Sequence, residues 1–208
     1  MSAETLVGFV LASVLLALSP GPDNLFVLAQ SALQGRLAGI VITLGLCTGL
    51  IVHTAAVALG VAALIQTSPT AFLALKIMGA GYLVYLAWGA FRAGKAADGN
   101  AGAVSLTYSR LYRRGIVMNV SNPKVTIFFL AFLPQFVDAS LGNATAQIAL
   151  LGALFMLSAL LVFSVIAVAA GGLSDYLRRS PMALAWLNRL AGAVFVLLAL
   201  RLLLAEAG

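Results

Sequence analysis

An apolar segment from about Leu6 to about Leu33 is interrupted by the run Ser19-Pro20-Gly21-Pro22-Asp23-Asn24. Neither proline has an N–H group with which to bond to the carbonyl one turn earlier, so carbonyls near residues 16–18 lose their helical partners. The glycine permits a sharp bend. A carboxylate and a carboxamide follow at once, although a membrane helix seldom carries either. The run therefore predicts a helix that is kinked or broken.

Composition places the chain among integral membrane proteins. Of its 208 residues, 62% are hydrophobic and 9% are charged, with a mean hydropathy of +1.09, whereas soluble domains have roughly 45–50% apolar and 25% charged residues. The net charge of +6 does not indicate a nucleic-acid partner, because the basic residues cluster in short links between apolar segments. The one cysteine, Cys47, can form no internal disulfide. We expect a lipid bilayer and a small molecule as partners, and no cofactor or metal.

Six segments are long and apolar enough to cross a membrane, since a helix needs about 20 residues to span a core of about 30 Å. They cover residues 4–33, 38–66, 70–93, 110–136, 143–172 and 182–206. A polar linker separates the third segment from the fourth. The chain is thus predicted to comprise a first three-helix repeat (1–93), a cytoplasmic linker (94–109) and a second three-helix repeat (110–208).

The two halves resemble each other in sequence. The opening run and the five residues after it align without a gap with Ser121-Asn122-Pro123-Lys124-Val125-Thr126-Ile127-Phe128-Phe129-Leu130-Ala131. Further along, Ser68-Pro69 matches Ser180-Pro181, and residues 76–83 match residues 189–196. A repeat of three spans must be inverted in its second copy. The sequence predicts an all-α, polytopic membrane protein of six transmembrane helices, built as two inverted three-helix repeats with broken helices 1 and 4.

The distribution of basic residues predicts the orientation of the chain. The first, third and fifth links, with their flanking span ends, carry Arg36, then Arg92, Lys95, Arg110, Arg113 and Arg114, then Arg178 and Arg179. The second and fourth links carry none. By the positive-inside bias the three basic links are cytoplasmic, and both termini lie outside.

Glycine pairs in the second span predict close helix packing. Gly35-x-x-x-Gly39 and Gly45-x-x-x-Gly49 have the spacing that lets two helix backbones approach closely. Packing within the chain is the favoured interpretation, because such spacings are frequent in membrane proteins rich in Gly and Ala. The alternative is a dimer face, which would make the protein a homo-oligomer.

Each predicted break carries a charge, Asp23 in the first span and Lys124 in the fourth. A charge at the bilayer centre costs about 2.5–3.5 kcal/mol, and paired breaks in two inverted halves indicate a transporter's midplane site. A zwitterion would place its ammonium on Asp23 and its carboxylate on Lys124 and the half-helix ends. The predicted substrate-binding residues are Pro20, Gly21, Pro22, Asp23, Asn24, Asn119, Asn122, Pro123, Lys124 and Thr126. The alternative is a pair of proline kinks that only shape the bundle.

Two residues are candidates for coupling transport to protons. Asp23 could carry a proton, although a direct pair with Lys124 would keep both groups charged. His53, in the second span, could carry protons or line the cavity, and a hydrogen bond to a neighbouring helix is an equally good interpretation.

Three motifs together resemble the lysine exporter family, the LysE/RhtB-type amino-acid exporters. They are Pro20-Gly21-Pro22 with Asp23-Asn24 in the first span, Gly79-Ala80-Gly81-Tyr82-Leu83 in the third and Asn122-Pro123-Lys124 in the fourth. The resemblance covers essentially the whole chain, and it marks Pro20, Gly21, Pro22, Asn122, Pro123 and Lys124 as signature positions. It implies export of amino acids or close derivatives across the inner membrane of a bacterium, driven by the proton gradient. It also implies a protein that often forms an oligomer.

The cargo within this family is predicted from the charges. Apart from Asp23, no carboxylate at membrane depth is evident to receive a cationic side chain, because Asp138 and Asp175 fall at span ends. A neutral cargo such as threonine, homoserine, homoserine lactone or leucine is therefore favoured.

Two other functions fit the sequence less well. A cation or metal exporter needs several carboxylates or soft ligands, and the acidic residues lie mostly at span ends. An intramembrane enzyme would have to use the single histidine, and no Gly-x-Ser-x-Gly or His-Glu-x-x-His motif is present. We expect no enzymatic activity.

Overall fold

The computed structural model describes residues 1–67, 69–92 and 105–204, and within these ranges it contains helices and no strands. The elements are α1 (Ala3–Leu18), α2 (Pro22–Gln34), α3 (Arg36–Thr67), α4 (Pro69–Arg92), α5 (Tyr108–Val120), α6 (Pro123–Ile127), the π-helical turn η1 (Phe128–Phe132), the 3-10 turns η2 (Leu133–Phe136) and η3 (Ala139–Leu141), α7 (Ala144–Arg179) and α8 (Pro181–Leu204). The all-α fold class is confirmed. Most of the predicted linker lies outside the described residues.

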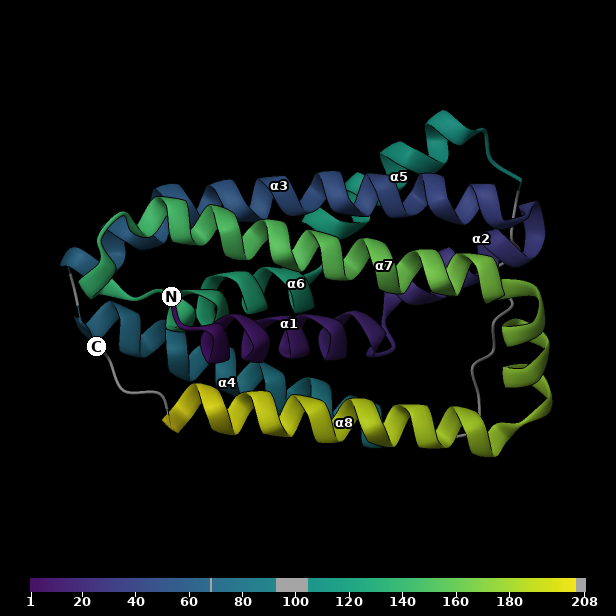
Figure 1. Cartoon of the computed structure of the whole chain (residues 1–208). Coiled ribbons are helices and arrows are strands. Elements are labelled where there is room, and N and C mark those ends of the chain that lie inside the picture. The colour runs from purple at the N-terminus through teal and green to yellow at the C-terminus, as the bar shows by residue number, and fades with distance from the viewer. Residues whose placement is uncertain (68, 93–104, 205–208) are drawn as a thin grey trace.

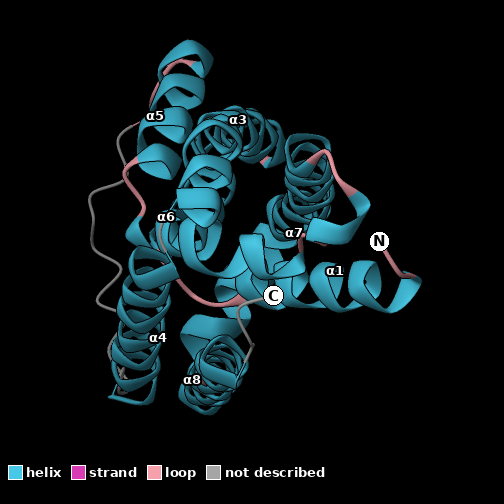
Figure 2. Ribbon diagram, turned by 90° about the vertical axis from the view of Figure 1, so that its left-hand side faces the viewer, coloured by secondary structure: helices cyan, strands magenta, loops and turns pink. Residues whose placement is uncertain are grey.

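The long helices run side by side in one bundle (Figure 1). Helices α3 and α7 pack together along one side, and α4 and α8 form a second pair on the other. Helices α1 and α6 run between the two pairs, and α5 covers α3 from outside (Figure 2). The two interrupted segments therefore meet in the interior of the bundle.

Two segments of the chain are bent, as the sequence predicts. Helices α1 and α2 meet at 58°, and α5 meets the segment from Pro123 to Phe136 at 48°. Pro22 and Pro123 each stand in the first turn of the second half-helix, where a missing N–H costs no hydrogen bond. Both breaks therefore follow from local proline chemistry.

Length and composition identify which described helices could cross a membrane. The stretches Arg36–Gly60 and Ala144–Ala170 each pass this test, and each bent pair passes as one span. The described residues thus provide up to four spans. Six spans in two inverted repeats remains a prediction.

The fold gathers the predicted basic links at one end of the bundle. The junction of α2 and α3, the start of α5 and the end of α7 lie at the right in Figure 1, whereas the N-terminus and the end of α8 lie at the left. Within the described residues, this arrangement agrees with the sidedness expected from the distribution of arginines.

Glycines allow α3 to approach its neighbours closely. A Cβ atom on Gly49 would lie 2.8 Å from the Cβ of Asn119 in α5, and one on Gly115 would lie 2.6 Å from the carbonyl oxygen of Ile42 in α3. A Cβ on Gly39 would meet Ala167 of α7 at 2.6 Å. The spacing in the second span therefore serves packing within the chain. Gly35 has a different role, because it caps α2 with a φ of 87°, which glycine favours.

Aromatic rings fix α1 against the segment that follows the second break. Phe9 lies 5.1 Å from Phe136 between ring centroids, and Phe128 lies 5.2 Å from Phe155 of α7. Both Phe9 and Phe128 are fully buried. Such packing holds the two breaks in register with each other.

Candidate functional site

One carboxamide joins the two breaks. Asn122 donates from Nδ2 to Oδ2 of Asp23 at 2.9 Å, and both residues are buried. Its Oδ1 accepts from the backbone N–H of Lys124 at 3.0 Å, which caps the start of α6. Asn122 thus stabilises one half-helix while it holds the carboxylate of the other.

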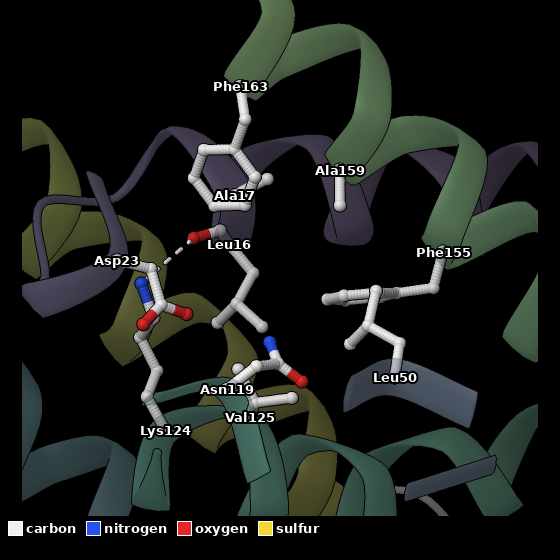
Figure 3. A pocket seen from close by; sticks show the side chains of 10 residues that line it. All are labelled: Leu16, Ala17, Asp23, Leu50, Asn119, Lys124, Val125, Phe155, Ala159 and Phe163. Atoms are coloured by element: carbon white, nitrogen blue, oxygen red, sulfur yellow. Dashed lines mark hydrogen bonds between the residues drawn. The ribbon is translucent and has the colours of Figure 1, made fainter. Parts of the chain in front are cut away.

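Lys124 binds the carbonyl end of α1. Its Nζ donates to the carbonyl of Leu16 at 3.3 Å and to that of Ser19 at 3.0 Å. The Leu16 carbonyl is the one that Pro20 leaves without a helical partner, and the end of a helix carries partial negative charge. These hydrogen bonds go to carbonyls rather than to Asp23, although the two charges lie near enough to interact (Figure 3). The direct pair that the sequence allows is replaced by a cap across the two breaks.

Two further carbonyls near the end of α1 also have partners. Asn24 donates from Nδ2 to the carbonyl of Ala17 at 2.6 Å, and the Ser19 N–H donates to the carbonyl of Leu15 at 3.0 Å. Helix α1 can therefore end inside the bundle without unbonded carbonyls at these positions.

His53 adds a hydrogen bond at the second break. Pro123 cannot bond to the carbonyl of Asn119, which accepts from the Asn122 N–H at 3.0 Å and lies 3.1 Å from the Nε2 atom of His53. Because a carbonyl only accepts, this ring nitrogen must donate. The ring also packs on Phe129, 5.6 Å away between centroids. The hydrogen bond to a neighbouring helix is thus present, and a proton-carrying role stays a prediction.

Gly21 provides room for the lysine. A Cβ atom on this residue would lie 3.0 Å from the Nζ of Lys124, closer than ordinary van der Waals contact. Its φ of −171° is extended backbone that any residue adopts. The glycine therefore leaves room for the lysine, whereas its backbone conformation is open to other residues.

A small cavity lies between the breaks and α7. Its volume is about 10 Å³, room for about one water molecule, whereas small-molecule sites usually measure about 300–1,000 Å³. It is lined by Leu16, Ala17, Asp23, Leu50, Asn119, Lys124, Val125, Phe155, Ala159 and Phe163 (Figure 3). The structure is closed around this site, and a larger ligand requires the surrounding helices to move apart.

Several buried oxygens near the breaks lack a hydrogen-bond partner among the described residues. They are Ser19 Oγ, Asp23 Oδ1, Asn24 Oδ1 and Asn119 Oδ1. A buried acceptor without a donor costs about 1–3 kcal/mol. Such atoms mark a place where a ligand with hydrogen-bond donors would be stabilised.

The predicted site residues converge, but they do not all face the cavity. Asp23, Asn119 and Lys124 line it. The three prolines shape the backbone, and Thr126 donates to the carbonyl of Asn122 at 3.1 Å. Sequence reasoning missed the apolar lining, above all Phe155, Ala159 and Phe163 on α7. Their spacing of four residues places them on one helix face, yet any core-facing helix has the same pattern.

A helical bundle in which two broken helices meet at a buried polar cluster defines a membrane protein of the transporter class. The sequence matches the model of the LysE type translocators over residues 14–206, and the chain belongs to this family. The resemblance seen in the motifs is thereby confirmed.

Similar proteins include a membrane protein and an efflux protein. The chain is 32% identical over 197 residues to the homoserine/homoserine lactone efflux protein of Salmonella typhimurium, which covers 95% of each chain. It is 33% identical over 195 residues to an uncharacterized membrane protein of Pseudomonas aeruginosa, covering 90% of this chain and 89% of the relative. No solved structure matches.

Proposed function

We propose that this protein is a secondary transporter that exports small neutral amino acids or their derivatives from the bacterial cytoplasm. The observation that carries the proposal is the pair of opposite charges, Asp23 and Lys124, on two broken helices around one cavity. An amino acid has a matching ammonium and carboxylate. Placement in the inner membrane belongs to the same proposal.

Neutral cargo is favoured by the cavity lining. Asp23 is the one acidic side chain among the described lining residues, and most of the others are apolar, among them Leu50, Val125 and Phe155. A cationic side chain on the cargo would need a second carboxylate to avoid an unpaired charge. The relatives described as homoserine/homoserine lactone efflux proteins support homoserine and its lactone, with threonine and leucine as further candidates.

Export by proton antiport is part of the proposal, with Asp23 and His53 as the candidate coupling residues. The geometry favours Asp23, because its Oδ1 has no partner among the described residues and the side chain lines the cavity. The Nε2 of His53 is already engaged by the Asn119 carbonyl. Proton uptake on Asp23 would weaken its hold on an ammonium group, which is how exchange of proton and cargo would be coupled.

A transport assay tests this function. Inside-out vesicles containing the protein are given an imposed proton gradient and a panel of radiolabelled amino acids, with homoserine lactone included. We expect uptake of at least one neutral member, abolished by a protonophore and absent from vesicles without the protein. Uptake of cadmium or potassium with no uptake from the panel would show a cation exporter instead.

A further inference from the structure

The carbonyl end of α1 already binds an ammonium group in this structure. That ammonium is the Nζ of Lys124, held by the carbonyls of Leu16 and Ser19 at 3.3 and 3.0 Å. Lys124 is 6% exposed, so the ammonium is bound away from solvent. Any primary ammonium placed here could form the same hydrogen bonds and would be attracted by the same partial negative charge of the helix end.

A carboxylate oxygen beside this position is unused. Asp23 is 2% exposed and lines the cavity, and its Oδ1 has no hydrogen-bond partner among the described residues, whereas Oδ2 accepts from Asn122. An ionised carboxylate only accepts hydrogen bonds. This oxygen can accept a further hydrogen bond, and an ammonium has three N–H donors.

Lys124 also blocks the α1 carbonyls to a second ammonium. Its side chain lines the roughly 10 Å³ space, and a Cβ on Gly21 would already lie 3.0 Å from Nζ. A second ammonium cannot occupy the carbonyls while the lysine remains there. A lysine that leaves them becomes free to donate to an anionic or carbonyl oxygen of the ligand.

We propose that the carbonyls of Leu16 and Ser19, together with Asp23, form the binding site for the cargo's ammonium group, and that Lys124 fills this site until cargo displaces it. The inference rests on the proposed function and adds a statement of which groups the cargo must carry. A primary ammonium is essential, and a free carboxylate is not, because Lys124 can donate to the carbonyl oxygen of a lactone or ester as well as to a carboxylate.

Amine rescue tests the site without any transport assay. Lys124→Ala removes three carbons and the ammonium, which together correspond to propylamine. We expect millimolar propylammonium to raise the thermal unfolding temperature of purified Lys124→Ala, with little effect on wild type or on Arg189→Ala, which loses an exposed cation. Lys124→Ala/Asp23→Asn should show a smaller effect. No stabilisation of folded Lys124→Ala, or equal stabilisation of all variants, would overturn the proposal.

Ligand binding to the wild-type protein keeps the proposal testable if Lys124→Ala does not fold. Calorimetric titration compares homoserine, homoserine lactone and N-acetylhomoserine. We expect the first two to bind, and the N-acetyl compound to bind at least about 100-fold more weakly, because it has no ammonium to replace that of Lys124 at the α1 carbonyls and Asp23. Equal affinity for N-acetylhomoserine would overturn the ammonium site while leaving amino-acid export intact. Stabilisation of Lys124→Ala by propylamine, with no transport of any amino acid by the wild type, would overturn amino-acid export while leaving the ammonium site intact.

Discussion

Asn122 and Asp23 lie 99 positions apart in the sequence and share a hydrogen bond of 2.9 Å. Each residue sits beside a proline at a helix break, and the bond connects the two breaks directly. Because Asn122 also caps α6, a movement of Asp23 that keeps this bond would also move the start of the second half-helix. This coupling is what an exchange of proton and cargo at Asp23 would require.

Asn122→Asp tests that coupling. The substitution retains the capping oxygen for the Lys124 N–H, but it places a second carboxylate against Asp23, where like charges repel. We expect loss of transport and a lower unfolding temperature, measured in proteoliposomes and in detergent. Asn143→Asp is the matched control, because Asn143 caps the start of α7 at an exposed position, and it should behave like wild type. Wild-type transport by Asn122→Asp would show that the bond is dispensable.

Gly21→Ala tests the space beside Lys124. The added methyl group would lie 3.0 Å from Nζ, so the ammonium or the backbone of the break must shift by a few tenths of an ångström, which disturbs the hydrogen bonds of Lys124 to the α1 carbonyls. We expect reduced transport and a stability loss of about 1–3 kcal/mol. Gly81→Ala, with nothing within 4 Å of the new atom, should transport normally and be slightly stabilised, because alanine favours helix interiors. Equal behaviour of the two variants would contradict the role given to Gly21.

Lys124→Ala should abolish transport while the protein still inserts in the membrane. It also removes the donor from two buried carbonyls. A buried carbonyl without a hydrogen bond costs about 1–3 kcal/mol of folding free energy. We therefore expect a measurable drop in unfolding temperature in addition to the loss of flux. Arg189→Ala provides the comparison, since it loses an exposed cation. Wild-type flux from Lys124→Ala would remove this residue from the site.

His53→Gln separates a structural donor from a proton carrier. Glutamine can still donate to the Asn119 carbonyl but cannot titrate. We expect transport within about threefold of wild type, with the same dependence on pH, and a larger stability loss for His53→Leu. If His53→Gln instead abolishes proton dependence, then His53, and not Asp23, carries the coupling proton.

Much of this architecture is predictable because its causes are local. The missing N–H of Pro20 and of Pro123 interrupts a helix whatever surrounds it, and the predicted breaks are where the chain bends. The length of each apolar run also sets approximate helix bounds, as the prediction of residues 38–66 for α3 illustrates. The family follows from the motifs at the two breaks.

The partners of the freed carbonyls could not be predicted from the sequence. That carbonyls near residues 16–18 lose their helical partners follows from the prolines, but their capture by Lys124 depends on a contact across 108 positions. The sequence allowed Lys124 to pair with Asp23, and it left the partner of His53 open. Likewise, Phe155 lines the cavity only because α7 packs against both broken helices. The sequence by itself determined where the helices break, because backbone hydrogen bonding is local. Only the tertiary structure decided which side chains satisfy the breaks and how little space remains between them, because packing brings distant residues together.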